Sequence, residues 1–142
     1  MKTIQVTAIK FGFVVFFVSA ALLASAQAPA RVVLHLQSAD TLVHKSVVNQ
    51  ISNLKKEIPG LQMELVCHGP GLTFLMKDKS LYADRLHAQK ISDLVIVGCE
   101  FTMQQRGLTK ADLVPFTGTV PFGIAEIVKK QQAGWLYVKL GF

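Results

Sequence analysis

The feature that most constrains the fold is an alternation of short apolar runs with segments of helical periodicity. Apolar residues dominate 31–37, 61–68 and 94–98, and each run has the length of a β-strand. Over 41–57, by contrast, apolar side chains recur every three or four residues, which predicts a helix with one buried stripe. Strands that alternate with helices are typical of a parallel sheet, because parallel neighbours need a crossover between them.

The rest of the chain continues this alternation, with glycine and proline marking the boundaries. The further elements that we expect are short helices at 84–90 and 101–106, a strand at 114–120 weakened by Pro115 and Gly118, a helix at 122–132 and a last strand at 135–140. The predicted fold class is therefore α/β, a three-layer sandwich with a mainly parallel sheet of about five strands.

The N-terminal residues have the composition of a cleavable export signal. The first ten include two lysines, 11–23 is almost wholly apolar, and Ala24-Ser25-Ala26 fits an A-x-A cleavage site. The apolar segment is short for a membrane span, and an uncleaved N-terminal anchor is the alternative. We therefore expect a signal peptide at 1–26 and a single domain at 27–142. The mature protein would be periplasmic or secreted, with no stable membrane anchor.

The charge pattern argues against a nucleic-acid partner. The full chain has a formal charge of +6, and loss of the two lysines of the signal would lower it to +4. The remaining lysines lie in separated pairs beside predicted helices, such as Lys55-Lys56 and Lys129-Lys130, without interleaved aromatic residues. Such pairs are typical of solvated helix faces, whereas a nucleic-acid site needs a continuous basic surface.

Candidate site residues follow from the ends of the predicted strands, because ligands of open parallel sheets bind at the carboxyl ends. The residues at these ends are Gln37, Ser38, Asp40, Cys67, His68, Gly69, Cys99 and Pro121–Gly123. Cys99 is the leading candidate, because a helix beginning directly after it would place unpaired N–H groups beside its sulfur and favour the thiolate. The alternative is a small apolar residue buried at the end of a core strand.

The histidines are weaker candidates than Cys99. His68 lies at the same predicted edge and could assist Cys99 as a base or proton donor, or could simply bond to a loop. His35 falls inside the first strand and is expected in the core or in an interface. His44 and His87 fall on predicted helices and are expected to be exposed.

No metal and no cofactor are expected. Cys67, His68 and Cys99 could together supply soft ligands, but no CxxC or HxxxH spacing supports a metal site. The turn that begins at Gly69 resembles the start of a dinucleotide-binding loop, but Phe74 occupies the third glycine position of that motif.

A Cys67–Cys99 disulfide is a further alternative, since two cysteines in an oxidising compartment can pair. The bridge requires Cα atoms roughly 4.4–6.8 Å apart, which adjacent strands would allow and more distant strands would forbid. The sequence does not reveal the strand order, so this alternative stays open.

Four short motifs add to this list of candidates. They are His68-Gly69, the segment Val97–Met103 around Cys99, Val120–Gly123 and Gly134–Val138. Together they resemble the DsrE/DsrF-like family, in particular its small exported or periplasmic members. The likeness extends over almost the whole mature chain, 31–140.

The resemblance implies a function as well as a fold. Its better-understood members are α/β sandwiches that assemble into homo- or hetero-oligomers, often trimers or hexamers. A cysteine in them carries sulfur as a persulfide and passes it to a partner protein in sulfur oxidation or tRNA thiolation. Cys99 matches that cysteine, and His68 matches the His-Gly turn of the family. The export signal argues against tRNA thiolation, which takes place in the cytoplasm.

The expected function is therefore a periplasmic sulfur carrier, with a sulfur donor or acceptor protein as partner. The alternative is a non-catalytic oligomeric protein that binds a small ligand or serves as a scaffold. Bulky side chains near the predicted site give modest support to assembly, although at least half of them are expected to complete the core. These residues are Phe101, Met103, Phe116, Phe122 and Phe142.

Overall fold

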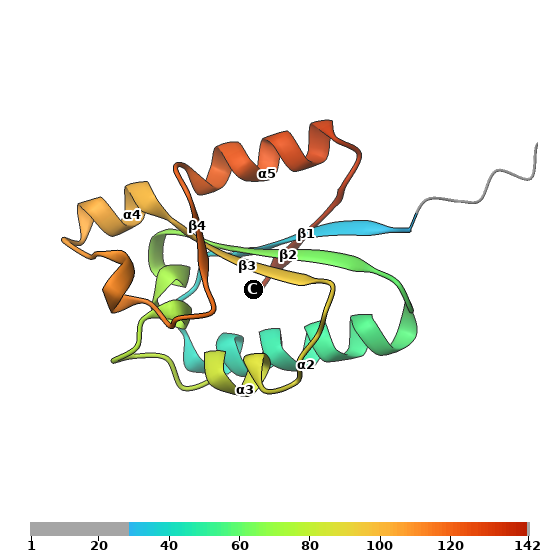
Figure 1. The fold of residues 1–142 in the computed structure, drawn as a ribbon, viewed down its shortest axis with the longest axis horizontal. Coiled ribbons are helices and arrows are strands. Elements are labelled where there is room, and N and C mark those ends of the chain that lie inside the picture. Colours follow the sequence, from blue (N-terminus) through green and yellow to red (C-terminus); the bar gives the residue numbers. More distant parts are fainter. Residues whose placement is uncertain (1–28, 142) are drawn as a thin grey trace, which may run out of the picture.

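A five-stranded sheet lies at the centre of the described residues, 29–141, of the computed structural model (Figure 1). The predicted signal peptide, 1–26, lies outside them. The strands are β1 (Arg31–Leu36), β2 (Gln62–Cys67), β3 (Leu94–Cys99), β4 (Gly118–Val120) and β5 (Leu136–Leu140). Their order is β4-β3-β2-β1-β5, and every neighbouring pair is parallel.

Helices cover both faces of this sheet. The α-helices are α2 (Thr41–Glu57), α3 (Ala83–His87), α4 (Glu100–Gln105) and α5 (Gly123–Gln132), and short 3₁₀ turns occur at Gly69–Leu75 and Lys110–Asp112. In Figure 1, α5 lies over one face, α2 and α3 lie under the other, and α4 continues from the end of β3. The predicted three-layer α/β sandwich is confirmed. None of the helices described within 29–141 has the length and apolar character needed to cross a bilayer.

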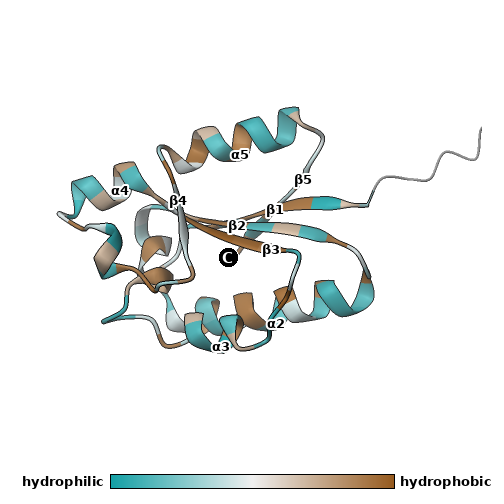
Figure 2. Cartoon of the chain, viewed as in Figure 1, coloured by the Kyte–Doolittle hydropathy of each residue, from teal (hydrophilic) through white to brown (hydrophobic). Residues whose placement is uncertain are grey.

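Alternate residues of the central strands face different layers, because successive side chains of a strand point to opposite sides. On β1, Leu34 and Leu36 pack in the larger core cluster with the residues of α2 and α3. Val33 packs with Ile127 of α5 in the smaller cluster on the other face. Figure 2 shows that β3 is hydrophobic along most of its length, as expected for a strand buried on both sides.

α2 begins at an N-cap residue, Asp40. The Asp40 carboxylate accepts a hydrogen bond from the Leu42 N–H at 2.8 Å, which satisfies one of the free N–H groups of the first turn. Val43, Val47 and Ile51 then recur on the buried face of the helix. The apolar residues whose spacing predicted this helix are therefore the residues that it buries against the sheet.

The expectation that His44 is exposed is wrong, since its residue exposure is 3%. Its Nε2–H donates to the carbonyl oxygen of Ser38 at 2.7 Å, and its ring packs edge-on against Phe74. The hydrogen bond removes the cost of burying the imidazole, so His44 extends the apolar stripe of α2.

β4 is shorter than the predicted strand at 114–120. Only Gly118–Val120 pairs with β3. Pro115 has no N–H to contribute to a sheet, and the N–H of Val114 donates instead to the carbonyl of Leu75 at 2.9 Å. The first half of the predicted strand is therefore a loop.

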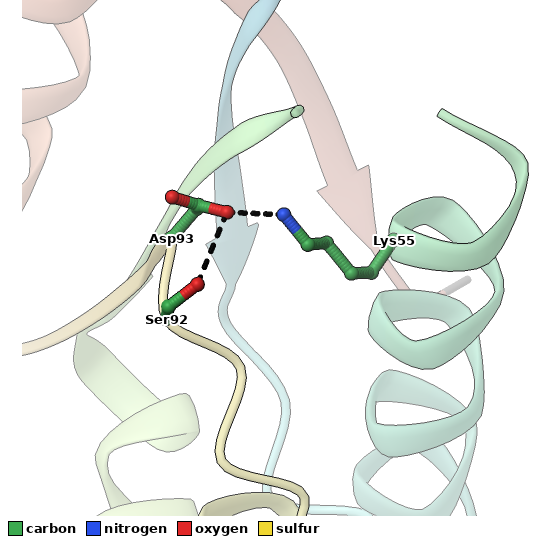
Figure 3. Close-up of polar contacts among 3 residues, drawn as sticks. All are labelled: Lys55, Ser92 and Asp93. Atoms are coloured by element: carbon green, nitrogen blue, oxygen red, sulfur yellow. Dashed lines mark hydrogen bonds and ion pairs between the residues drawn. The ribbon is translucent and has the colours of Figure 1, made fainter. Parts of the chain in front are cut away.

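Two ion pairs connect helices to the sheet. Lys55, near the end of α2, binds Asp93, which also accepts a hydrogen bond from the Ser92 hydroxyl at 3.3 Å just before β3 (Figure 3). Lys130 of α5 binds the buried carboxylate of Glu64 on β2. These contacts hold α2 and α5 over opposite faces of the sheet.

Candidate functional site

His68 and Cys99 lie together where the strands end, on the face covered by α5. A Cβ built on Gly123, the first residue of α5, would lie 3.0 Å from the Cβ of His68 and 3.3 Å from the Cβ of Cys99. A side chain at position 123 would therefore require His68 and Cys99 to move, so glycine is the residue that lets α5 begin this close without such a shift. The start of α5 covers the two candidates that the sequence analysis had placed at this edge.

Hydrogen-bond donors surround the sulfur of Cys99. The Gly123 N–H donates to Sγ at 3.2 Å, and the Thr102 hydroxyl and the N–H groups of Phe101 and Thr102 also contact it. The Thr102 hydroxyl oxygen accepts from the Gly69 N–H at 3.0 Å, which leaves its own proton free for the sulfur. This cradle comes from three segments: the start of α4, the turn after β2 and the start of α5.

The cradle changes the acidity of the thiol. Burial raises the pKa of Cys99, but the hydrogen bonds from Thr102, Gly123 and Phe101 outweigh it, and the net pKa lies below the ordinary thiol value. The residue is only 3% exposed. The expected helix start beside Cys99 is therefore present, and it acts through individual N–H groups at contact distance.

Cys67 differs from Cys99 in its surroundings and in the acidity of its thiol. It is fully buried in the larger core cluster, and burial raises the pKa of its thiol far above the ordinary value. Cys67 pairs with Gly98 in the sheet register, so Cys99, one residue further, points to the opposite face. Both cysteines are free. A Cys67–Cys99 disulfide is excluded because the two side chains point to opposite faces of the sheet, although β2 and β3 are adjacent.

Two further residues, His35 and Tyr137, belong to the site, although the sequence did not assign them to it. Nε2 of His35 lies 2.5 Å from Nε2 of His68, and Nδ1 of His35 lies 2.8 Å from the hydroxyl of Tyr137. Tyr137, His35, His68 and Cys99 come from β5, β1, the end of β2 and the end of β3, in the order of the strands in the sheet. His35 had been expected in the core or in an interface; it is buried and bonded to a site residue.

Both imidazoles are neutral near pH 7. Burial lowers the pKa of His35 to about 4, with further lowering by His68 and by the Lys139 ammonium. Burial also lowers the pKa of His68. Because each neutral ring has one N–H and one lone pair, one Nε2 must donate to the other.

Two other strand-end residues, Ser38 and Asp40, have structural roles. Asp40 caps α2, and the Ser38 carbonyl accepts from His44. A Cβ on Gly71 would lie 2.1 Å from the carbonyl oxygen of Leu36, so the glycine turn is needed for the close approach of two backbones. Within 29–141 no group of three His, Cys, Asp or Glu side chains could hold a metal ion.

The bulky residues near the site divide between core and surface. Met103 is buried and Phe116 is partly buried against the core, whereas Phe142 lies outside the described residues. Phe101 and Phe122 are 44% and 45% exposed, and their ring centroids lie 5.1 Å apart beside Cys99 and Gly123 in the chain. An exposed aromatic pair therefore lies next to the residues that cover the sulfur.

A cavity lies outside this site. It has a volume of about 480 Å³ and lies beside the first half of β3, lined among others by His87, Val95 and Phe116. The chemistry of the Cys99 site, rather than cavity size, makes it the candidate functional site, because donors that lower the pKa of a thiol are typical of reactive cysteines.

Comparisons with known proteins give the fold. Neither the models of known protein families nor the curated proteins gave a match. Among solved structures, the chain is similar to the protein of unknown function MTH1491 from Methanobacterium thermoautotrophicum, with a TM-score of 0.73 and 24% identity. The match covers 78% of this chain and 98% of that chain. Likeness at this identity shows the α/β fold alone.

Proposed function

We propose that this protein is a thiol-based sulfur carrier of the DsrE/DsrF-like type, which accepts sulfur on Cys99 as a persulfide. The observation that supports the proposal is the cradle of donors from Gly123, Thr102 and Phe101 around Sγ. The thiolate is the form that attacks another sulfur atom, and these donors stabilise it. His68 is the assisting group, since it is the titratable side chain that packs with Cys99 against Gly123.

Cys67 and Cys99 point to opposite faces of the sheet, which fits a carrier in an oxidising compartment. The predicted export signal implies such a compartment. Cys67 is the only other cysteine of the chain, and it lies in the core on the opposite face. A persulfide on Cys99 would therefore not be lost to a disulfide within the same chain.

Mass spectrometry of the purified protein tests the proposal. After incubation with thiosulfate or an alkyl persulfide, the wild-type protein should gain the mass of one sulfur atom on the peptide that contains Cys99. Cys67→Ser is the matched control and should gain the same mass. A sulfur adduct that persists in Cys99→Ser would contradict the assignment.

A second candidate function is a non-catalytic oligomeric protein that binds a small ligand or serves as a scaffold. The low exposure of Cys99 favours it, because 3% leaves little of the residue open to a reagent. Alkylation by iodoacetamide under native conditions separates the two functions. A Cys99 that reacts faster than a free thiol peptide at pH 7 supports the carrier, whereas one that reacts only after unfolding supports the scaffold.

Assembly with further copies or related subunits belongs to both candidates. Exposed apolar side chains continue from Phe101 and Phe122 along α5, where Ile124 and Val128 are 43% and 47% exposed and one helical turn apart. Apolar side chains that cluster in this way are typical of protein interfaces. A homo-oligomer, or a hetero-oligomer with related subunits, would cover them.

A further inference from the structure

A hydrogen-bonded chain of three side chains connects the exposed edge of the sheet to the buried site. Tyr137 on the edge strand β5 is 41% exposed, whereas His35 and His68 are 6% and 9% exposed. The links are 2.8 Å from the Tyr137 hydroxyl to His35 Nδ1 and 2.5 Å from His35 Nε2 to His68 Nε2. Each link is within direct hydrogen-bond distance, so no water is needed between the groups.

The last group of this chain lies at the same strand ends as Cys99. His68 uses Nε2 for His35, which leaves Nδ1 as its free nitrogen. Its Cβ and that of Cys99 pack against the same residue, Gly123. The backbone thus brings the end of the hydrogen-bonded chain and Cys99 to the same residue of α5, and the transfer between His68 Nδ1 and the sulfur is part of the inference.

Neutral imidazoles give the chain two equivalent arrangements. In the first, the Tyr137 hydroxyl donates to His35 Nδ1, His35 Nε2–H donates to His68 Nε2, and His68 carries its proton on Nδ1. In the second, every bond is reversed: His68 Nε2–H donates to His35 Nε2, His35 Nδ1–H donates to the Tyr137 oxygen, and the hydroxyl proton points to water. Conversion between them moves a proton between water and His68 Nδ1 and leaves no charged ring behind.

We propose that the Tyr137–His35–His68 chain is a proton path between solvent and Cys99, and that it suits alkyl persulfides as sulfur donors. The inference rests on the proposed function of Cys99 and adds the donor class and the route of the proton. Alkyl thiolates are poor leaving groups, so a proton delivered as they depart accelerates the transfer. Aryl thiolates need no such proton.

The transfer balances without an added oxidant. The Cys99 thiol gives its proton to His68 Nδ1 as the second arrangement becomes the first, and one proton leaves to water from Tyr137. The Cys99 thiolate attacks the outer sulfur of R–S–SH; a new sulfur–sulfur bond forms as that of the donor breaks. The departing R–S⁻ takes the proton from His68 Nδ1, and the chain refills from water. The sum is Cys99–SH and R–S–SH giving Cys99–S–SH and R–SH.

Two disulfide reagents test the path independently of sulfur transfer. Dithiobis(nitrobenzoate) releases an acidic aryl thiol, and bis(hydroxyethyl) disulfide releases an alkyl thiol. In Tyr137→Phe and His35→Gln, the rate of mixed-disulfide formation on Cys99 with the alkyl reagent should fall by about tenfold or more. The rate with the aryl reagent should stay within about twofold, because its leaving group departs unprotonated and the donors that set the amount of Cys99 thiolate are kept in both variants. Tyr82→Phe and His87→Gln are the matched controls and should change neither rate.

The outcomes separate a proton path from a structural role. If both variants slow the two reagents equally, the chain only supports the fold of the site, and the proposal is overturned. Equal rates in the wild type and the variants with both reagents overturn it as well. Failure of Cys99 to react with either reagent in the native wild type would overturn the path and the carrier together.

Uptake of sulfur from an alkyl persulfide distinguishes this inference from the proposed function. The wild-type protein could gain no sulfur while its reaction with the alkyl disulfide still depends on Tyr137 and His35. That result would support the proton path and reject the carrier function. Uptake at the same rate in the wild type and both variants retains the carrier and rejects the path.

Discussion

The N–H of Gly123 donates to the sulfur of Cys99 at 3.2 Å, across 24 residues of sequence. This bond joins the start of α5 to the end of β3 and makes the acidity of the thiol depend on how closely the helix packs. It exists because position 123 lacks a side chain, since a Cβ there would lie 3.0 Å from His68 and 3.3 Å from Cys99.

Gly123→Ala should therefore weaken both the fold and the site. We expect the free energy of unfolding to fall by about 1–3 kcal/mol, because the added methyl group overpacks the contact between α5 and the sheet. The pKa of Cys99 should rise as the N–H moves away from the sulfur. Urea denaturation and a pH profile of alkylation measure the two effects. The neighbouring exposed position gives the control, and Ile124→Ala should change stability by no more than about 0.5 kcal/mol.

The Thr102 hydroxyl provides a second test of the cradle. Thr102→Val removes the donor to Cys99, so the thiolate loses a charge-assisted hydrogen bond and the pKa of the thiol rises. Alkylation near pH 7 should slow by about tenfold. Thr102→Ser keeps the hydroxyl and should react like the wild type. Equal slowing in both variants would show that loss of the hydroxyl does not account for the effect.

A free-thiol count checks the direction of the cysteines. The unreduced, denatured protein should contain two free thiols, since Cys67 and Cys99 point to opposite faces of the sheet. In the native protein Cys67 should resist every reagent, because it is fully buried. Fewer than two thiols per chain in a monomeric fraction would mean that an internal disulfide forms after all.

The buried histidine pair makes stability depend on pH. The pKa of His35 falls from 6.5 in the unfolded chain to about 4 in the folded protein, and that of His68 is lowered as well. At a pH between the two pKa values of His35, the unfolded state binds a proton that the folded state does not. The free energy of unfolding therefore falls as the pH falls. For His35 the full loss is roughly 3 kcal/mol. The groups that face the pair are Tyr137 and Lys139 of β5 and Cys99 of β3.

Denaturant titrations between pH 7 and pH 4 measure this slope. His35→Gln should flatten it, whatever the effect of the substitution on stability at pH 7. His87→Gln, at an exposed histidine, should keep the wild-type slope. A slope that is unchanged in His35→Gln would mean that other groups take up the protons.

The exposed aromatic pair predicts self-association. Light scattering at micromolar concentration should give a mass above that of one chain, because Phe101, Phe122, Ile124 and Val128 leave apolar surface uncovered. The double variant Phe101→Ser/Phe122→Ser should shift the protein toward the monomer. Leu81→Ser, at an exposed apolar residue on a different segment, is the control. A wild-type monomer would contradict the assembly proposal.

Local signals in the sequence were sufficient for the elements and for the edge at which the site lies. The apolar repeat predicted α2, whose first turn Asp40 caps, and one of the glycines that mark the boundaries, the left-handed Gly134, follows the end of α5. These signals succeed because capping and helical periodicity depend on neighbours within a few residues. The same reasoning placed His68 and Cys99 at strand ends, and parallel strands bring such ends together.

The tertiary structure alone decided which side chains meet. His35 is 33 residues from His68 and 102 residues from Tyr137, and their contact exists only because β1 lies between β2 and β5. Strand order and the face of each side chain come from packing across the whole chain, which no local pattern contains. The sequence by itself thus determined the parts of this protein and the edge of its site. The packed sheet decided that Cys67 points away from Cys99. It also decided that two histidines and a tyrosine, His35, His68 and Tyr137, join Cys99 in one site.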